Sequence, residues 1–421
     1  MADVKNDKLG LYLSVPFCRS KCTYCNFASG VYPASEHERY VDRLTVDLGN
    51  AGRWAEDMGV TLPRTVDTVY LGGGTPSLLS PELIARIFAS VRSNFQVETS
   101  AEITVECAPG QLSDATLEAM ARVGVNRVSL GVQSFVDREA QVSGRLHSRS
   151  MVLDDLRRLR AAGIVNLNID LIAGLAGQTF ASWKESLDEL VQTGVPHASV
   201  YMLEVDEDSR LGRELLGSGT RYHAGLVPTD DAIAQMYETA IETLEGVGLK
   251  QYEISNFARR GRRSAHNMRY WQRRPYLGVG LDASSALRAA DDATESAQQR
   301  RIPYILRSTT SDDLAEYLSG TPVVETAWLS PDRQHEEAWF LGLRLNQGVA
   351  LAALRREFGR VAIEAILAIV ERLVETGLAA SDGKTVRLTP QGRLLSNDVF
   401  QEFLATADSV DPAEASLVQQ S

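Results

Sequence analysis

Cysteine is scarce in this chain: there are four in 421 residues, and three of them fall within the single stretch 18–25. This distribution does not suit a disulfide framework and is typical of a protein from a reducing compartment. Apolar runs of the ~20 residues that cross a bilayer are also missing. The first seven residues contain no apolar run that could serve as a signal peptide. We therefore expect a cytoplasmic protein, with peripheral membrane contact left open.

Positive charge is in short supply as well. Lysine and arginine together number 43 against 55 aspartate and glutamate residues, which gives a formal net charge of −12. Binding to nucleic acid relies on clustered Lys and Arg, so this balance argues against a nucleic-acid partner. Hydrophobic residues make up 44% of the chain and charged residues 23%, a composition that favours a packed globular protein over a disordered one.

The first half of the chain alternates short apolar segments with longer amphipathic ones. Between the short segments, apolar residues recur at helical spacing over 35–54, 81–94, 114–123, 150–162 and 179–193. This alternation is typical of βαβ units around a parallel sheet. Six units predict an α/β protein with a partial (β/α)6 barrel, whose functional residues lie at the carboxyl ends of the strands. The predicted strands span residues 11–15, 66–71, 101–106, 127–132, 165–173 and 197–203.

The second half is less regular. A polar connection with four glycines at 204–228 predicts a loop over the barrel mouth. Beyond residue 335, three predicted helices, a β-like segment at 385–388 and a last helix predict a small, mostly helical, winged-helix-like domain. Its acidic and basic residues are nearly equal in number, which favours an accessory domain over DNA binding. We expect a barrel domain at 1–290, a connecting segment at 291–334, the accessory domain at 335–404 and a disordered tail at 405–421.

The cysteine cluster is Cys18-Arg19-Ser20-Lys21-Cys22-Thr23-Tyr24-Cys25, which follows the first predicted strand. Thiolates are ligands of iron–sulfur clusters and of zinc. Three thiolates can hold a cubane cluster and leave its fourth iron open. A structural zinc site would need a fourth ligand, and neither Cys107 nor His37 is well placed to supply one. The spacing therefore favours an iron–sulfur cluster over zinc or an unliganded trio.

Polar residues recur where the other predicted strands end. Gly72-Gly73-Gly74-Thr75-Pro76 follows the second strand and is neither a P-loop nor a dinucleotide-binding pattern. Asp170 interrupts an apolar strand, where a carboxylate needs partners. Arg145, on a loop, could pair with a carboxylate through two hydrogen bonds. Asp170, together with Glu106 and Gln133 at two further strand ends, could accept hydrogen bonds from the amine and hydroxyl groups of a ligand.

These features resemble the radical SAM superfamily, and within it the branch of the oxygen-independent coproporphyrinogen III oxidases, over roughly residues 11–404. The stretches that carry the resemblance are Val15–Cys18, Leu71–Ser77, Gly131–Phe135, Asn168–Leu175, Tyr252–Ala258 and Leu388–Arg393. The resemblance implies a [4Fe–4S] cluster held by Cys18, Cys22 and Cys25, whose open iron chelates S-adenosylmethionine (SAM). The SAM site that it implies is lined by Tyr12, Tyr24, Gly73, Gly74, Thr75, Glu106, Gln133, Arg145 and Asp170.

Two functions compete within this branch. One is the oxidation of coproporphyrinogen III, an enzyme reaction of porphyrin biosynthesis. The other is that of the HemW family of heme chaperones, which bind heme and deliver it to respiratory proteins. Three features favour the chaperones: Phe27 stands where the oxidases carry a further cysteine, only about ten residues precede the first strand, and residues 266–271 resemble the His-Asn-x-x-Tyr-Trp stretch of HemW. A radical SAM enzyme acting on another substrate is a third alternative.

The resemblance also indicates a heme site at residues 266–271, with His266 as an axial ligand and Tyr270 and Trp271 as flat contacts for the macrocycle. Nearby Arg262, Arg263 and Arg269 are candidates to pair with its propionates. Relatives usually carry a histidine where this chain has Ser284. The sequence leaves open the consequence of that difference, the identity of the heme acceptor, homodimer formation, and whether SAM is cleaved or only bound.

Overall fold

The computed structural model describes residues 8–217, 219–290, 302–320 and 324–404. Residues 291–301 and 321–323 of the expected connecting segment and the tail expected at 405–421 lie outside these residues. The described part of the chain divides into two compact units, residues 8–270 with 274–328 and residues 271–273 with 329–404. None of its helices is long and apolar enough to cross a bilayer.

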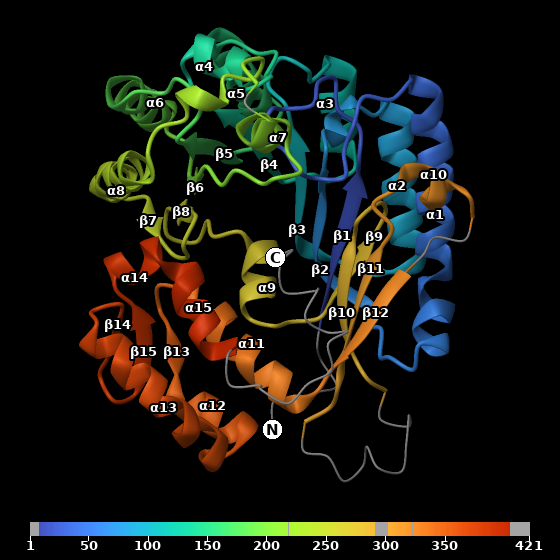
Figure 1. The fold of residues 1–421 in the computed structure, drawn as a ribbon. Coiled ribbons are helices and arrows are strands. Elements are labelled where there is room, and N and C mark those ends of the chain that lie inside the picture. Colours follow the sequence, from blue (N-terminus) through green and yellow to red (C-terminus); the bar gives the residue numbers. More distant parts are fainter. Residues whose placement is uncertain (1–7, 218, 291–301, 321–323, 405–421) are drawn as a thin grey trace. The chain divides into compact units, whose positions relative to one another are not determined.

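The first unit is built on six parallel strands that lie side by side in sequence order, and the predicted fold class is confirmed. Their residues are buried on both faces, as expected for parallel strands covered by helices. The six strands are β1 (Leu9–Val15), β2 (Thr65–Gly73), β3 (Gln96–Cys107), β4 (Arg127–Gln133), β5 (Asn166–Ala173) and β6 (His197–Met202) (Figure 1).

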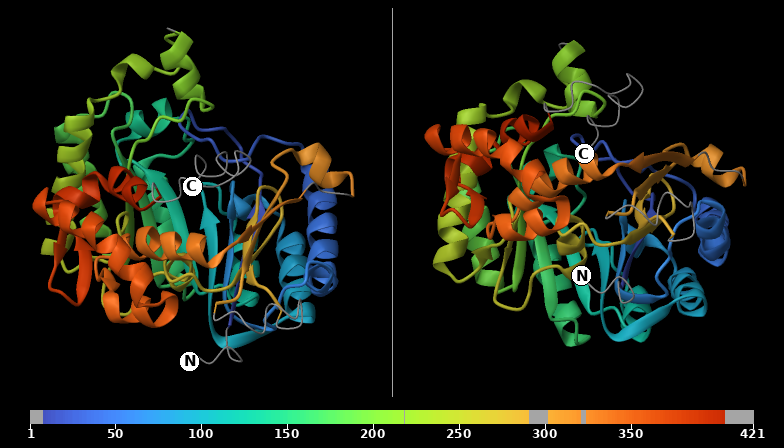
Figure 2. Two further views of the ribbon diagram at one scale, coloured as in Figure 1. Left: turned by 60° about the horizontal axis from the view of Figure 1, so that its bottom comes forward. Right: turned by 90° about the horizontal axis from the view of Figure 1, so that it is seen from below.

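Helices follow these strands and cover the outer side of the sheet. In Figure 2 the blue helix α1 and the light-blue helix α2 lie next to each other outside the strands. Side-chain caps start several of them: Ser80, Ser113 and Thr179 each accept a hydrogen bond from a backbone N–H of the first turn. The helical segments up to β6 are α1 (Ala34–Asp57), η2 (Pro76–Leu78), α2 (Pro81–Asn94), α3 (Asp114–Arg122), α4 (Asp137–Val142), α5 (Arg149–Ala161) and α6 (Phe180–Thr193).

Shorter elements extend the sheet at both edges. Strand β9 pairs with β1 in parallel, β10 and β11 continue antiparallel, and β8 pairs antiparallel with β6. The described part of the expected connecting segment 291–334 thus contributes two strands, β11 and β12, to the sheet. The elements after β6 are α7 (Arg210–Gly217), η3 (Ala224–Leu226), α8 (Asp230–Gly246), β7 (Lys250–Gln251), β8 (Asn256–Ala258), α9 (Ala265–Trp271), β9 (Tyr276–Val279), β10 (Ser284–Arg288), β11 (Ile305–Thr310), α10 (Leu314–Leu318) and β12 (Val324–Leu329).

The connection at 204–228 differs from the expected loop, because it contains helix α7. Its glycines suggested irregular backbone, but Leu211 is only 2% exposed and its backbone N–H donates to the Thr23 carbonyl at 2.8 Å. Burial of this apolar side chain against the cysteine loop outweighs the low helix propensity of glycine.

The second unit combines short helices with a three-stranded sheet of order β13-β15-β14. Its core includes Trp339 and Phe403, whose rings stack with centroids 5.2 Å apart. Helices followed by a small hairpin agree with the predicted winged-helix-like domain. Its elements are α11 (Pro331–Leu343), β13 (Val349–Ala350), α12 (Leu351–Phe358), α13 (Arg360–Glu375), β14 (Ala379–Ser381), β15 (Thr385–Leu388), α14 (Pro390–Leu394) and α15 (Ser396–Leu404).

Candidate functional site

A cavity of about 580 Å³ lies where the six parallel strands end. Most residues that the sequence assigned to the cluster and to SAM line it, although they come from distant parts of the chain. Tyr12 is an exception: its ring packs against Tyr70, with centroids 6.1 Å apart, and it does not belong to the lining. The predicted residues that do line the cavity are Cys18, Cys22, Cys25, Tyr24, Gly73, Gly74, Thr75, Glu106, Gln133, Arg145 and Asp170.

The cysteine loop is held in shape by its own backbone. The Cys18 N–H donates to the Gly30 carbonyl, and the Gly30 N–H donates to the Pro16 carbonyl, both at 2.8 Å. Each thiol has a polar side chain nearby: the Thr75 hydroxyl is 3.9 Å from the Cys18 sulfur, the Ser29 hydroxyl 3.9 Å from the Cys25 sulfur, and Arg145 Nη1 3.6 Å from the Cys22 sulfur. Burial raises the pKa of the Cys18 thiol, so a positive partner such as iron is needed to hold it as a thiolate.

The cysteine arrangement fits a cubane cluster better than a single ion. In the described residues, no group of three or more His, Cys, Asp or Glu side chains is placed to hold one metal ion. A single ion requires all its ligands at bonding distance from one point. Each thiolate of a cubane instead binds a different iron, so its three sulfurs stay further apart. Three thiols that line one cavity match the number of thiolates in the predicted cluster site.

The glycine segment lies directly against the cysteine loop. The Gly74 N–H donates to the Val15 carbonyl at 2.8 Å, and the Thr75 N–H donates to the Phe17 carbonyl at 2.7 Å. A Cβ atom on Gly74 would lie 2.7 Å from that Phe17 oxygen. Glycine is therefore required at this position, because a side chain would separate the two segments that form this wall of the cavity.

Glu106 places a buried carboxylate in the wall of the cavity. Oε1 accepts from the Tyr70 hydroxyl at 2.7 Å and Oε2 accepts from the Gly73 N–H at 3.2 Å. Burial raises the pKa of Glu106 to about 7, with the negative charge of Asp170 adding to the effect. A cationic amine in the cavity would stabilise the ionised form.

Asp170 is the second buried carboxylate of the cavity. It accepts from the Ser129 hydroxyl at 3.0 Å and from Asn168 Nδ2 at 2.7 Å. Burial raises its pKa, while its hydrogen bonds act in the opposite direction. These partners satisfy the carboxylate in part and fix its direction, so further acceptor capacity remains for a hydroxyl ligand.

Gln133 and Arg145 complete the polar lining. The backbone of Gln133 has φ 69°, a left-handed conformation that is uncommon outside glycine and typical of strained residues at functional sites. Its Oε1 is buried and has no hydrogen-bond partner within the described residues. The Arg145 guanidinium donates to the Gly131 carbonyl and to Cys22. A buried acceptor without a partner in a polar cavity indicates that a ligand or water completes it.

Sequence reasoning missed several lining residues. Ser129 and Tyr201 both face the cavity. Their signal was present: Ser129 lies between two apolar residues of β4, and Tyr201 is two positions beyond Ser199 on β6, so that both follow the inward alternation of their strands. The fourth cysteine, Cys107, also lines the cavity, and burial raises the pKa of its thiol to about 12.

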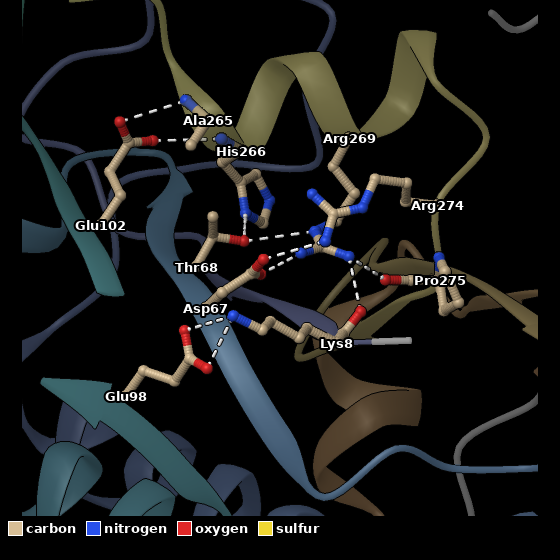
Figure 3. A network of polar contacts seen from close by, with 10 residues as sticks. All are labelled: Lys8, Asp67, Thr68, Glu98, Glu102, Ala265, His266, Arg269, Arg274 and Pro275. Carbon is tan, nitrogen blue, oxygen red and sulfur yellow. Dashed lines mark hydrogen bonds and ion pairs between the residues drawn. The ribbon is translucent and has the colours of Figure 1, made fainter. Parts of the chain in front are cut away.

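The predicted heme residues lie elsewhere. His266 is 1% exposed and both nitrogens of its ring have partners. Nδ1 is 2.9 Å from the Thr68 hydroxyl (Figure 3), and Nε2 is 2.8 Å from the Tyr270 hydroxyl. Burial, together with the charge of Arg269, lowers the pKa of His266 to about 3, so the imidazole is neutral. Glu102 accepts from its backbone N–H at 3.0 Å. This arrangement favours a structural role for His266.

Arg269 belongs to the same network. Its guanidinium is fully buried, pairs with Asp67, and donates to the carbonyls of Lys8 at 2.8 Å and Pro275 at 2.9 Å. It is therefore engaged inside the unit and is not placed to meet a propionate. Ser284, where relatives carry a histidine, is exposed and lies 2.9 Å from the Thr309 hydroxyl.

Trp271 belongs to the second compact unit. There the guanidinium of Arg344 lies over its ring, 4.3 Å from the centroid. Arg344 therefore covers this face of the indole through a cation–π contact.

Comparisons with known proteins agree with the fold and the cavity. The pattern of the radical SAM superfamily matches residues 12–190, and that of the HemN C-terminal domain matches residues 329–395. A solved structure of the coproporphyrinogen III oxidase HemN of Escherichia coli superposes with a TM-score of 0.78 over 96% of this chain and 91% of that chain, at 21% identity. At that identity the likeness shows the fold alone. The chain is a radical SAM protein.

Relatives in sequence define the group more narrowly. The heme chaperone HemW of Lactococcus lactis is 31% identical over 93% of this chain and 96% of its own length, and that of Bacillus subtilis is 32% identical over 93% and 98%. The heme chaperone HemW of Escherichia coli is 28% identical over 96% of this chain and 100% of its own length. The chain belongs to the HemW family.

Proposed function

We propose that this chain is a heme chaperone, which binds heme and delivers it to respiratory proteins. The observation that carries the proposal is its near full-length similarity, at 31–32% identity, to proteins named heme chaperone HemW. The cavity supports a second part of the proposal, that the chain also holds a [4Fe–4S] cluster and SAM. Neither part of the proposal depends on which respiratory protein accepts the heme, on a peripheral membrane contact or on a homodimer.

In this proposal, Cys18, Cys22 and Cys25 each bind one iron of the cluster. A bound cluster of this kind supplies an open iron that can chelate SAM and an electron that can cleave it. The acceptor Glu106 would take the ammonium group, and the guanidinium of Arg145 would pair with the carboxylate through charge-assisted hydrogen bonds.

The ribose hydroxyls of SAM would meet acceptors on neighbouring strands, namely the buried Oε1 of Gln133 and the carboxylate of Asp170. Gly73, Gly74 and Thr75 would let the ligand approach the backbone closely, and Tyr24 would close the wall beside the cluster loop. Tyr12 would support the wall of the cavity indirectly, because its ring packs against Tyr70. The chaperone proposal requires that SAM be bound, and not that it be cleaved.

Heme binding by residues 266–271 is a further part of the proposal. Axial ligation by His266 stays a prediction from the sequence. The imidazole could reach an iron atom only by giving up at least one of its contacts with Thr68 and Tyr270. Tyr270 and Trp271 likewise stay predictions as contacts for the macrocycle.

The proposal is tested with anaerobically reconstituted protein. We expect heme to titrate to a defined stoichiometry and to transfer to an apo-heme acceptor protein, while incubation with SAM and coproporphyrinogen III yields no multiple-turnover decarboxylation. Phe27, which stands where the oxidases carry a cysteine, lines the cavity and is 65% exposed, so the thiol of those enzymes is replaced by an inert ring. Multiple turnover of coproporphyrinogen III would establish the oxidase alternative, and failure to bind heme would remove the chaperone proposal.

A further inference from the structure

Four arginines are concentrated in one turn of this acidic protein. The sequence Arg259-Arg260-Gly261-Arg262-Arg263, here called the arginine turn, joins strand β8 to helix α9. All four arginine residues are exposed. The chain around them has a net charge of −12, so the turn is a local reversal of the overall charge.

The backbone of the arginine turn is fixed at both ends. The Arg259 N–H donates to the Pro196 carbonyl at 2.9 Å, the Arg262 N–H donates to the Arg259 carbonyl at 3.0 Å, and Gly261 has φ 77°. This geometry closes a tight turn with glycine at its left-handed position. Beyond it, the Glu102 carboxylate accepts from the backbone N–H groups of Ala265 and His266, as Figure 3 shows.

The charges of the turn are not neutralised within the protein. None of its four guanidinium groups forms an ion pair with a described residue; Arg263 lies over the buried Tyr252 ring, 5.4 Å from its centroid. Arginines a few residues further on behave differently, because Arg269 and Arg274 share Asp67 and Arg273 pairs with Glu357. The unpaired state is thus a property of the turn and not of this arginine-rich segment as a whole.

We infer that the arginine turn is a docking site for an acidic segment of a partner protein. Guanidinium groups bind carboxylates through two parallel hydrogen bonds, and arginine is enriched at the energetic centres of protein interfaces. Because the turn is held in place before binding, a partner does not have to order its backbone. This inference goes beyond the proposed function and does not depend on heme.

A protein segment suits the turn better than a membrane does. The described residues 250–274 include no exposed large hydrophobic side chain that could enter a lipid surface. A narrow acidic segment can reach the exposed arginines within a Debye length of about 10 Å without the apolar insertion that holds a protein on a lipid surface.

The experiment uses the full-length protein and a fluorescein-labelled deca-glutamate peptide, followed by fluorescence anisotropy at low ionic strength. The turn variant carries Arg259→Gln, Arg260→Gln and Arg262→Gln. A control variant carries the same loss of charge at exposed arginines elsewhere, Arg53→Gln, Arg122→Gln and Arg221→Gln. We expect the turn variant to bind the peptide about tenfold more weakly, since each exposed charge pair contributes modestly, and the control variant to bind like wild type.

Three results would overturn the inference. One is a wild-type protein that does not bind the peptide, and another is an equal loss in both variants, which would mean that net charge alone decides. The third comes from cosedimentation with vesicles of equal parts phosphatidylglycerol and phosphatidylcholine. A vesicle affinity lost only in the turn variant, with peptide binding unchanged, would assign the turn to lipid. Far-UV circular dichroism of both variants checks that the exposed substitutions leave the fold intact.

Discussion

The polar groups at the two ends of the parallel strands have different surroundings. At the carboxyl ends, a cavity of about 580 Å³ is lined by thiols, by carboxylates that include the buried Glu106 and Asp170, and by the Gln133 oxygen, which has no hydrogen-bond partner in the described part of the chain. At the amino-terminal ends, His266, Arg269 and Glu102 form a closed network with Thr68, Asp67 and backbone groups (Figure 3). The carboxyl ends hold polar groups that face a cavity, whereas the groups of this network contact one another. Two buried atoms at the amino-terminal ends, Arg127 Nε and Asn166 Oδ1, lie outside the network and have no hydrogen-bond partner among the described residues.

Because of this difference, we assign ligand binding to the polar residues at the carboxyl ends and structural support to the network at the amino-terminal ends. In α/β barrels the carboxyl end carries function, while polar residues at the amino-terminal end contribute to stability. A buried polar group that already has partners gains little from a ligand, because the ligand must replace existing hydrogen bonds. A buried group without a partner gains the full value of the new bond. The substitutions below test this contrast.

The largest expected effect is at the cluster. Replacing Cys18, Cys22 or Cys25 by alanine removes one of three thiolates, so we expect iron content and the visible absorbance after anaerobic reconstitution to fall to background. Cys107→Ala, at the buried cysteine of the same cavity, is the matched control and should keep the cluster. A cluster retained in all three single variants would show that these cysteines are not its ligands.

At the closed end, the largest effect is expected for Asp67→Ala. This substitution leaves the fully buried Arg269 without its carboxylate partner. Breaking such a pair from one side destabilises a protein by about 3–5 kcal/mol, measured by urea unfolding. Asp154→Ala removes the partner of the exposed Arg157 and should cost less than about 1 kcal/mol. Equal losses in the two variants would contradict the description of this end as a closed network.

His266→Ala distinguishes structural support from heme ligation. It removes the imidazole that contacts Thr68 and Tyr270, and we expect a loss of about 1–3 kcal/mol in unfolding free energy. If the role of His266 is structural alone, heme stoichiometry does not change in this variant and His266→Gln recovers part of the stability. The opposite pattern, heme binding lost at unchanged stability, would make His266 a ligand and would remove the contrast between the two ends.

The smallest effect concerns the charge of Glu106. Because burial raises its pKa to about 7, the carboxylate is ionised above that pH and protonated below it. SAM affinity should therefore fall as the pH drops below about 7, by up to about tenfold per pH unit. Equilibrium dialysis between pH 5.5 and 7.5 measures this dependence. Glu106→Gln should bind SAM weakly at every pH in that range, and a variant with the wild-type pH profile would mean that another group titrates.

The HemW-like stretch at 266–271 shows how far a motif can be interpreted without a structure. Its resemblance to the heme chaperones was correct at the level of the family. The roles of its residues could not be derived, because a histidine beside aromatic residues has the same local pattern whether it binds iron or supports a wall. Its partner Thr68 lies 198 positions away in the chain.

The sequence alone determined the order of the six parallel strands and of the main helices between them, the cysteine loop and the polar residues at successive strand ends. These follow from local periodicity and from spacing within a few residues, which burial and backbone geometry constrain directly. Only the tertiary structure decided that Tyr12 lies behind the cavity wall, that Arg269 is bound to Asp67 across 202 positions, and that the arginine turn has no ion-pair partner among the described residues. Whether a polar side chain is satisfied depends on which distant segments the fold brings to it, and no local pattern contains that information.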